Sequence, residues 1–267
     1  MQVSFNNKKI NYEDSGKGHV LVLLHGFTET LNMWNEFSKK LSAQFRVVCI
    51  DLPGHGKSEC VDDVHSMELM ADAVKTVLDK LNINKAVVVG HSMGGYVALS
   101  FARKYEHVLK GLGLFHSSAN SDSEQAKEGR MRAVEVIKKN HVDFLLNFIP
   151  DLFAPENRDV FKKEIEVLLT EARKIPVEGI IAALMGMKDR PDSNEILENA
   201  EYPVMFIAGH KDTRIPVKDV LAQLALPKTA YSLLLKKTGH MGYIEERSTT
   251  LNFLETFVKG CFSRNKD

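Results

Sequence analysis

The sequence predicts an α/β fold in which a mostly parallel central sheet is covered by helices on both faces. The first observation behind this prediction is a series of short apolar runs rich in β-branched residues, whose continuous apolar character indicates strands buried on both faces. The second is that stretches with helical spacing of apolar residues separate these runs. The apolar runs cover residues 20–24, 47–50, 86–89, 112–115 and 204–208.

The chain opens with a segment of a different pattern. Val3-Ser4-Phe5 and Ile10-Asn11-Tyr12 alternate apolar and polar residues, and the polar stretch Asn6-Asn7-Lys8-Lys9 lies between them. This pattern predicts a hairpin and therefore antiparallel strands at one edge of the sheet. Further along, apolar residues recur at helical spacing over residues 69–81 and again over residues 96–101, which predicts helices between the strands.

The alternation of strands and helices stops between residues 118 and 200. No strand pattern appears there, and amphipathic helices are predicted instead, for example over residues 131–139 and 142–148. We therefore expect residues 1–117 and 201–267 to form one core domain and residues 118–200 to form a helical lid inserted above it.

The predicted lid carries more apolar side chains than a solvated linker would, so it must cover something. As a group these side chains predict an apolar wall for a pocket. The candidate substrate-binding residues are Phe144, Phe148 and Leu184 in the lid and Met241 in the core. For any single residue, the alternative is that it only seats the insertion on the core.

Composition limits the classes of partner and location. The 267 residues suit one large α/β domain, since single cores stop growing near roughly 250–300 residues. The 35 basic side chains balance the 35 acidic ones, so no long-range field would gather a nucleic acid or an anionic membrane. The first residues lack a signal peptide's apolar core, and no apolar run could span a bilayer, so we expect a soluble, cytoplasmic protein. Cys49, Cys60 and Cys261 are too scattered to indicate disulfides or a zinc site.

A candidate nucleophile follows the buried run 86–89. Gly90-His91-Ser92-Met93-Gly94 is a G-x-S-x-G motif, and residues 96–101 behind it have helical spacing. Between a strand and a helix this motif puts the serine on a strained turn with its hydroxyl projecting, and the glycines let strand and helix approach closely. The turn also aims the Met93 N–H at whatever bonds to Ser92. The motif therefore predicts Ser92 as the nucleophile and Met93 as an oxyanion donor.

A serine nucleophile needs an imidazole base and a carboxylate that orients the base. Asp212 follows the last of the five apolar runs, and His240 follows a further apolar stretch, Tyr231 to Leu235. Both therefore lie on loops after strands, and the order Ser, Asp, His along the chain predicts a catalytic triad at one edge of the sheet. Asp122 and Asp219 are reserve candidates for the acid.

With these motifs the chain resembles α/β-hydrolase-fold serine hydrolases, and carboxylesterases in particular, from roughly residue 8 to residue 260. In that family the strand ending in His-Gly-Phe supplies a second oxyanion donor through the backbone N–H after His-Gly, which implies Phe27 here. The family also commonly carries Asp-x-x-Gly-x-Gly-x-Ser after the next strand, as in Asp51 to Ser58 here. The resemblance implies that this segment is a structural turn. Gly242 stands where many relatives have proline.

The same turn contains Gly56-Lys57-Ser58, which could be mistaken for a phosphate-binding loop. A P-loop needs a glycine where this chain has Asp51, whose carboxylate would repel phosphate. The residues after Ser58 are polar and acidic and lack the periodicity of the helix that a P-loop enters. We therefore expect Lys57 to point to solvent.

Serine at position 92 argues for acyl transfer, since the dehalogenases and epoxide hydrolases of this fold use a carboxylate nucleophile, as the resemblance implies. The leading hypothesis is a carboxylic ester hydrolase for small or medium acyl substrates, with no cofactor and no metal. Thioesterase, lactonase, C–C bond hydrolase and perhydrolase activities remain alternatives on the same triad. A ligand-binding receptor that kept the fold is an alternative from another class. Oligomeric state stays open.

Ten histidines invite a metal-site interpretation, but neither H-E-x-x-H nor a zinc-type Cys/His spacing is present. The histidines that fall near the predicted sheet edge are expected to make local hydrogen bonds; they are His25, His55, His91 and His210. Trp34 either lines the pocket or belongs to the core.

Overall fold

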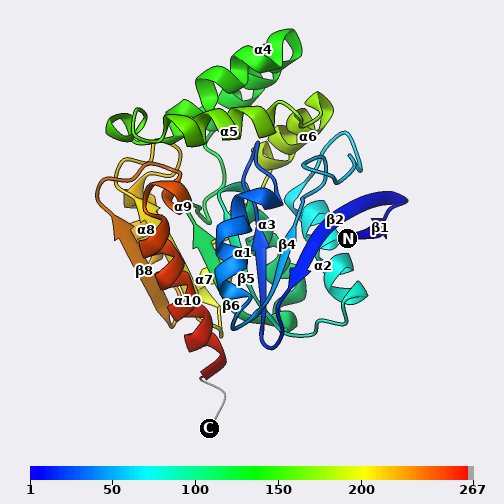
Figure 1. Cartoon of the computed structure of the whole chain (residues 1–267), viewed down its shortest axis with the longest axis vertical. Helices are drawn as coiled ribbons and strands as arrows, with labels where there is room; N and C mark the ends of the chain where they lie inside the picture. The colour runs from blue at the N-terminus through cyan, green and yellow to red at the C-terminus, as the bar shows by residue number, and fades with distance from the viewer. Residues whose placement is uncertain (264–267) are drawn as a thin grey trace.

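The predicted strands lie in an eight-stranded sheet in the computed structural model, which describes residues 1–263. The strand order is β1-β2-β4-β3-β5-β6-β7-β8. The strands are β1 (Gln2–Phe5), β2 (Lys8–Ser15), β3 (Val20–Leu24), β4 (Arg46–Ile50), β5 (Ala86–His91), β6 (Leu109–Phe115), β7 (Val204–Gly209) and β8 (Ala230–Leu235). Figure 1 shows the sheet with helices packed against it, so the predicted α/β class is confirmed.

The antiparallel strands are confined to the N-terminal edge. β1 pairs with β2 and β2 pairs with β4 in antiparallel fashion, whereas every other pairing in the sheet is parallel. Asn6 and Asn7 connect β1 to β2 with φ values of +49° and +62°. Asparagine tolerates this left-handed region better than most residues, which suits it to a two-residue hairpin turn. The predicted edge hairpin is confirmed.

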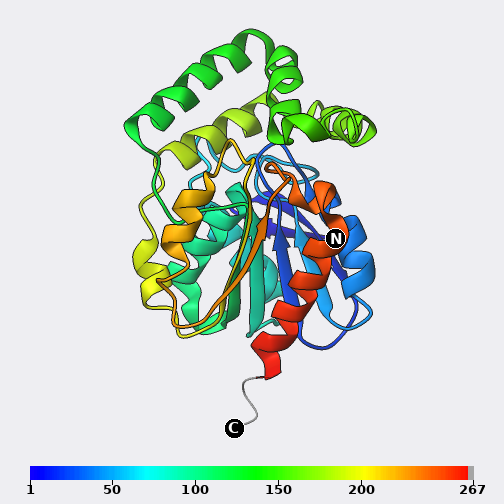
Figure 2. The ribbon, with the colours of Figure 1, turned by 90° about the vertical axis from the view of Figure 1, so that its left-hand side faces the viewer.

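Successive residues of the buried strands contribute their side chains alternately to two separate apolar cores, one on each face of the sheet. On β3, for example, Val22 and Leu24 belong to the core that α2 and α3 complete. Leu21 and Leu23 belong to the other core, which α1 and α10 complete. Figure 2 shows helices on both sides of the sheet. This double coverage explains why the strands are continuously apolar.

The helices over 69–81 and 96–101 are confirmed as α2 and α3. The helices that cover the sheet are α1 (Asn35–Leu41), α2 (Met67–Lys80), α3 (Met93–Tyr105), α8 (Val217–Gln223), α9 (Gly242–Glu245) and α10 (Arg247–Ser263). Trp34 ends the 3₁₀ turn η1 (Leu31–Trp34) and is fully buried, which places it in the core. Cys49 is buried as a small apolar residue.

A group of helices lies across one end of the sheet (Figures 1 and 2). They are α4 (Glu124–Phe148), α5 (Lys162–Ala172) and α6 (Val177–Lys188), and α7 (Asn194–Glu198) leads back to β7. The two helices expected at 131–139 and 142–148 form the single element α4, which is interrupted at Asn140. Asn140 leaves helical geometry, and its side-chain oxygen accepts from the Asp143 N–H at 3.3 Å, so it caps the second half of α4.

The segment Asp51 to Ser58 is a turn organised around a buried carboxylate. Asp51 Oδ1 accepts the Leu31 N–H at 2.8 Å, and Oδ2 accepts the Lys57 N–H at 2.9 Å. Gly56 has φ +56°, and a Cβ there would lie 2.3 Å from the Asp51 carboxylate. The Lys57 side chain is exposed. The N–H of Lys57 therefore binds the carboxylate of Asp51, and the exposed Lys57 side chain agrees with the prediction that it points to solvent.

Candidate active site

Ser92 lies on a sharp turn between β5 and α3. Its φ of +49° is in the left-handed region, where a non-glycine residue is strained. The two flanking glycines are sterically required, because a Cβ on Gly90 would lie 2.0 Å from the Gly94 carbonyl group. The turn is held by hydrogen bonds from the Ser92 N–H to the Phe115 carbonyl at 2.9 Å and from Ser117 Oγ to the Ser92 carbonyl at 2.8 Å.

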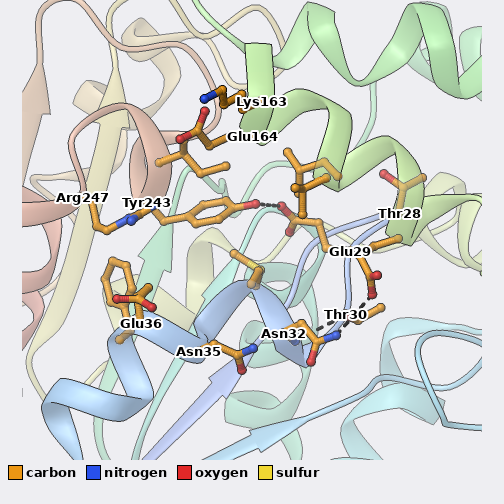
Figure 3. Close-up of a pocket in the computed structure, with 16 residues that line it drawn as sticks. Thr28, Glu29, Thr30, Asn32, Asn35, Glu36, Lys163, Glu164, Tyr243 and Arg247 are labelled. Carbon is orange, nitrogen blue, oxygen red and sulfur yellow. Dashed lines mark hydrogen bonds between the residues drawn. The ribbon is translucent and has the colours of Figure 1, made fainter. Parts of the chain in front are cut away.

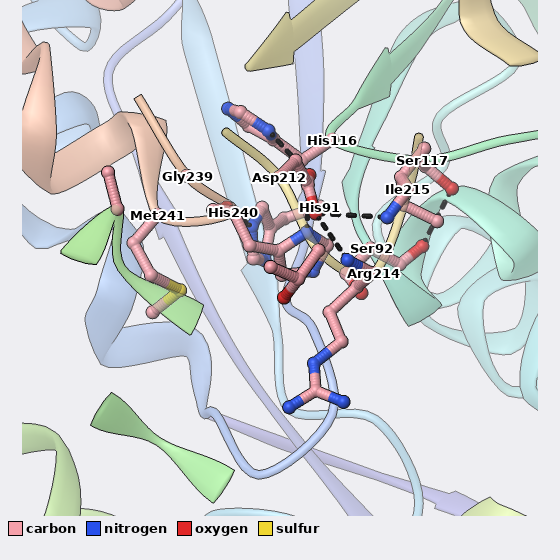
Figure 4. A network of polar contacts seen from close by, with 12 residues as sticks. His91, Ser92, His116, Ser117, Asp212, Arg214, Ile215, Gly239, His240 and Met241 are labelled. Atoms are coloured by element: carbon pink, nitrogen blue, oxygen red, sulfur yellow. Dashed lines mark hydrogen bonds and ion pairs between the residues drawn. The ribbon is translucent and has the colours of Figure 1, made fainter. Parts of the chain in front are cut away.

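Asp212 and His240 meet across the loops that follow β7 and β8 (Figure 4). His240 Nδ1 is 2.7 Å from Asp212 Oδ2, and both side chains are almost fully buried. Asp212 Oδ1 accepts the backbone N–H groups of Arg214 at 2.8 Å and Ile215 at 2.9 Å. The His240 N–H donates to the Leu152 carbonyl at 2.6 Å, so the segment after α4 helps to hold the histidine loop.

The environment of Asp212 keeps its carboxylate ionised. Burial by itself would raise the pKa of Asp212. The charge of His240 and the hydrogen bonds from His116 and His240 outweigh burial and hold the Asp212 pKa well below its usual range. An ionised carboxylate accepts the Nδ1–H of His240 and leaves Nε2 of that ring free to accept a proton.

Ser92 and His240 line the same cavity. Among the hydrogen bonds of residues 1–263, none joins Ser92 Oγ to His240, so the two side chains share the cavity wall without a hydrogen bond between them. Catalytic hydrogen bonds are often long before substrate binds and tighten in the complex. The structure therefore joins Asp212 to His240 by a hydrogen bond and places His240 and Ser92 in the wall of one cavity.

The predicted oxyanion donors flank Ser92. Met93 is the first residue of α3, and its side chain is fully buried. Phe27 follows β3 and lines the cavity. A Cβ on Gly26 would lie 3.3 Å from the Ser92 Cβ, which shows that the His25-Gly26-Phe27 turn passes directly beside the serine.

A second buried polar network, not foreseen from the sequence, lies behind this turn. Glu29 Oε2 accepts the Gly26 N–H at 2.7 Å and contacts His91 Nδ1 at 2.8 Å, while Oε1 accepts the Tyr243 hydroxyl at 2.8 Å. His91 Nε2 lies 3.0 Å from the His240 carbonyl oxygen. The network therefore connects the loops that carry Phe27, Ser92 and His240.

The hydrogen bonds of His91 differ from the expectation of local contacts, because both partners are far away in the chain. Both partners are also acceptors, so both ring nitrogens donate and the imidazole is protonated. Burial would lower the pKa of His91, but the charge of Glu29 and its hydrogen bond outweigh burial and raise it. Burial would likewise raise the pKa of Glu29, and His91 reverses this and lowers it. Glu29 and His91 therefore form a buried ion pair.

The cavity that Ser92 and His240 share has a volume of about 640 Å³. Phe27, Phe144 and Phe148 form one aromatic wall, with ring centroids 5.2–6.5 Å apart. Leu184 also lines the cavity. Met241, the fourth candidate substrate-binding residue, does not line this cavity, because it is buried in the core on the α1 and α10 side of the sheet.

The cavity wall also carries charged side chains. Asp122, a reserve candidate for the acid, pairs with Arg130 and with Arg190, whose Nη1 lies 2.5 Å from Oδ1. Asp219, the other reserve candidate, lines the cavity from α8. The guanidinium of Arg214 lies 4.8 Å from the Phe148 ring centroid. Of the three candidate acids, Asp212 is the one hydrogen-bonded to His240.

A smaller cavity of about 280 Å³ lies on the other side of Glu29, between η1, α1, α5 and α9. Figure 3 shows Tyr243 pointing at Glu29 in its wall, with Lys163 and Glu164 of α5 nearby. Neither Ser92 nor His240 lines it. Glu29 thus separates the two cavities, and the larger one contains the candidate chemistry.

His116, Asp212 and His240 are the one group among residues 1–263 whose donor atoms are close enough together to suggest a metal site. His116 Nδ1 lies 3.1 Å from Asp212 Oδ2, and His240 Nδ1 lies 2.7 Å from the same oxygen. These are hydrogen-bond lengths. A zinc ion would instead have to sit between all three atoms, at about 2.0–2.2 Å from each. The arrangement therefore fits a hydrogen-bonded carboxylate better than a metal centre.

Comparison with known proteins assigns the family. Residues 19–247 match the α/β hydrolase fold family, and the chain belongs to it. A thermophilic esterase from Thermogutta terrifontis, solved with malate bound, superposes with a TM-score of 0.91 at 31% identity, covering 95% of this chain and 94% of that one. An esterase from Exiguobacterium antarcticum has the same fold, with a TM-score of 0.86 at 22% identity over 94% of this chain and 96% of that one.

Curated relatives are similar over most of this chain. The dihydrolipoyllysine-residue acetyltransferase component of the acetoin cleaving system of Pseudomonas putida is 31% identical over 88% of this chain, which spans 62% of that protein's length. A 2-hydroxy-6-oxononadienedioate/2-hydroxy-6-oxononatrienedioate hydrolase of Paraburkholderia phymatum is 29% identical over 94% of this chain and 91% of its own. None of the helices in residues 1–263 combines the length and apolar character needed to cross a membrane.

Proposed function

We propose that this member of the α/β hydrolase fold family hydrolyses a small or medium carboxylic ester through an acyl-enzyme on Ser92. The observation that carries the proposal is that Ser92, on its strained turn, opens into the same cavity as His240, whose ring is hydrogen-bonded to the buried Asp212. This combination of nucleophile, base and orienting acid is what serine acyl transfer requires.

In the proposed cycle, His240 Nε2 accepts the Ser92 proton as Ser92 Oγ attacks the substrate carbonyl. Asp212 holds the ring in the tautomer with hydrogen on Nδ1 and stabilises the imidazolium that forms. The backbone N–H groups of Phe27 and Met93 stabilise the oxyanion, each contributing about 10²–10³ in rate. His240 returns the proton to the leaving alcohol, and water, activated by the same ring, releases the acid.

The helices between residues 118 and 200 act in this proposal as a lid. Phe144 and Phe148 from α4 and Leu184 from α6 close the cavity over Ser92. The similarity to a thermophilic esterase over nearly the whole chain supports an ester as the substrate. Thioesterase, lactonase and perhydrolase chemistry would use the same residues and remain alternatives.

A second candidate is hydrolysis of a C–C bond next to a ketone. It is favoured by the relative from Paraburkholderia phymatum, which is named as a hydrolase of 2-hydroxy-6-oxo diacids and is aligned over 94% of this chain. The two candidates differ in the leaving group, which is an alcohol in one and a carbanion in the other. A non-catalytic receptor is disfavoured, because a pure binder gains nothing from a strained serine beside an oriented base.

The proposal is tested by steady-state hydrolysis of p-nitrophenyl acetate, butyrate and octanoate by the wild type and by Ser92→Ala. We expect the substitution to lower kcat by roughly 10⁴-fold or more while folding is retained. Ser121→Ala is the matched control, since it removes a serine hydroxyl from the wall of the same cavity and leaves the hydrogen bonds of the Ser92 turn in place. Activity that survives in Ser92→Ala, or is absent from the wild type, would reject the ester assignment.

A further inference from the structure

His116 is held in an unusual place for a histidine. It follows β6 with φ +48°, a left-handed backbone conformation that is unfavourable for a residue with a Cβ. Its backbone N–H donates to the Ile207 carbonyl at 2.8 Å, and its side chain has no exposed surface. Strained backbone persists where the surroundings enforce it, and it clusters at functional sites.

The protonation of His116 follows from its surroundings. Burial lowers the pKa of His116 to about 4 despite the neighbouring Asp212 carboxylate, so the ring is neutral near pH 7. Asp212 is ionised and can only accept, so His116 Nδ1 carries the hydrogen and donates to Oδ2 at 3.1 Å. The other ring nitrogen, Nε2, is buried without a hydrogen-bond partner among residues 1–263.

Gly242 provides the space for this ring. A Cβ at position 242 would lie 2.3 Å from His116 Nε2, too close for any real pair of atoms. No positive φ forces glycine at this position, so the contact with His116 is the steric reason for it. The glycine that departs from the proline of many relatives is thus the complement of a histidine 126 positions earlier.

His116 and His240 donate to the same carboxylate oxygen. With the backbone N–H groups of Arg214 and Ile215 on Oδ1, Asp212 accepts four hydrogen bonds and has no freedom to rotate. The donor from His116 also withdraws charge from Oδ2. The carboxylate therefore stabilises a protonated His240 less than it would with one histidine partner.

We propose that His116 is a positioning residue for the Asp212–His240 pair, and that Gly242 is the small residue that admits it. The hydrogen bond from His116 fixes the plane of the Asp212 carboxylate and moderates the basicity of His240. The inference rests on the proposed function, in which His240 is the base. Other charged groups near the pair are Arg214, the His91–Glu29 ion pair, whose imidazole centroid is 5.0 Å from that of His240, and Glu245, which accepts the Gly239 N–H at 3.0 Å.

The test compares His116→Leu with His116→Asn. Asparagine keeps a donor one bond beyond Cγ, as Nδ1 is, and tolerates positive φ, whereas leucine has a similar size and no donor. We expect His116→Leu to lower kcat for p-nitrophenyl butyrate by roughly 10-fold, because the carboxylate can move. The acidic limb of its kcat/KM profile should move to higher pH by roughly half a unit. His116→Asn should restore the wild-type profile.

Gly242→Ala gives an independent route should His116→Leu fail to fold. In the wild-type background the added methyl group pushes against His116 Nε2, so the acidic limb of the kcat/KM profile should move to higher pH, as in His116→Leu. In the His116→Asn background, where no ring atom reaches position 242, it should add no further shift. A wild-type profile in both His116→Leu and Gly242→Ala, or an unrescued loss in His116→Asn, would show that His116 is only a core residue.

Titration of the His240 ring by NMR separates this inference from the proposed function, because it needs no substrate. A higher titration midpoint in His116→Leu than in the wild type would support the positioning role even if no ester is hydrolysed. An unchanged midpoint would overturn it even if Ser92 proves to be an ester nucleophile.

Discussion

At the scale of single residues, the carboxylate of Asp212 is the group on which the candidate site most depends. In Asp212→Asn one of the two acceptor oxygens becomes an NH₂ donor, which would face either the two histidine rings or the two backbone N–H groups of Arg214 and Ile215. We expect kcat for an activated ester to fall by roughly 10⁴-fold, because His240 would be held in the wrong tautomer. Asp219→Asn is the control, since Asp219 lines the same cavity without contacting His240.

The pH range in which Asp212 is ionised and stabilises the fold follows from its lowered pKa. A carboxylate with a lowered folded pKa contributes stability that is present above its unfolded pKa, near 4, and lost as the pH falls through the folded value. Asp212 therefore stays ionised throughout the range in which ester hydrolysis is measured.

A rate of ester hydrolysis that fell in Asp219→Asn and survived in Asp212→Asn would assign the role of the acid to Asp219 instead.

The Glu29–His91 pair makes a prediction about stability. In Glu29→Gln the protonated His91 loses its counter-charge while remaining buried, and breaking a buried pair in this way costs roughly 3–5 kcal/mol of unfolding free energy. Denaturant unfolding of the two proteins measures this loss. Tyr243→Phe is the matched control, because it removes one hydrogen bond to Glu29 and leaves the charge pair intact, at a cost of about 1–2 kcal/mol.

The stabilisation by this pair has a defined pH window. Glu29 has a lowered folded pKa, so its contribution is present above the ordinary value of 4.5 and is lost as the pH falls through the folded value. His91 has a raised folded pKa, so its contribution is present below 6.5 and is lost as the pH rises through the folded value. Glu29→Gln should therefore be most destabilising between pH 4.5 and 6.5. An equal loss at every pH would contradict the ion pair.

At the scale of elements, the turn from Asp51 to Ser58 predicts that substitutions of its two charged residues, Asp51 and Lys57, have different effects on stability. Lys57→Ala should leave both activity and stability unchanged, since the Lys57 side chain is exposed and only its backbone N–H is used. Asp51→Asn should lower the unfolding free energy by roughly 1–3 kcal/mol, because the buried N–H of Leu31 or Lys57 would lose a charged acceptor. Thermal unfolding measures the stability of both variants, and hydrolysis of p-nitrophenyl butyrate measures the activity of Lys57→Ala. A Lys57→Ala protein that loses activity would reopen the phosphate-loop interpretation.

The strands and sheet helices could be predicted because their signal is local. Each buried strand is a continuous apolar run, and helical spacing is visible within α2 and α3. The interruption of α4 is less visible, because one non-helical residue, Asn140, separates two stretches that a pattern treats as independent helices. Trp34 could not be placed from sequence, since a core position and a pocket position at a helix start have the same pattern.

The residues of the candidate site also fall into those that could be predicted from the sequence and those that could not. Ser92, Asp212 and His240 could be predicted because each follows a strand, and parallel strands bring their carboxyl ends to one edge. Glu29 and His116 could not, since their roles depend on contacts with residues 62 and 96 positions away. The one available signal for His116 was a polar residue directly after the strand that ends at Phe115.

At the scale of the whole molecule, the proposed function depends on how the helices across the end of the sheet close the cavity. Arg130 of α4 and Arg190 after α6 both pair with Asp122, which precedes α4, so one buried carboxylate joins the beginning of the proposed lid to its end. The contact between the proposed lid and the core is made by Phe144 and Phe148, whose rings pack against Phe27, the residue that carries the proposed oxyanion donor. If the substrate is the proposed ester, we expect this wall to set the length of acyl chain that fits.

The apolar wall predicts how rate depends on substrate length. For p-nitrophenyl esters of increasing acyl length, kcat/KM should rise by up to roughly 0.8 kcal/mol, about fourfold, per added CH₂ until the cavity is full. Phe148→Ala should move the optimum to longer chains, because it removes a ring that packs on Phe27 at a centroid distance of 5.6 Å. Leu146→Ala on the same helix is the control, since that side chain is 42% exposed and does not line the cavity. Rates indifferent to chain length in all three proteins would mean that these rings only seat α4 on the core.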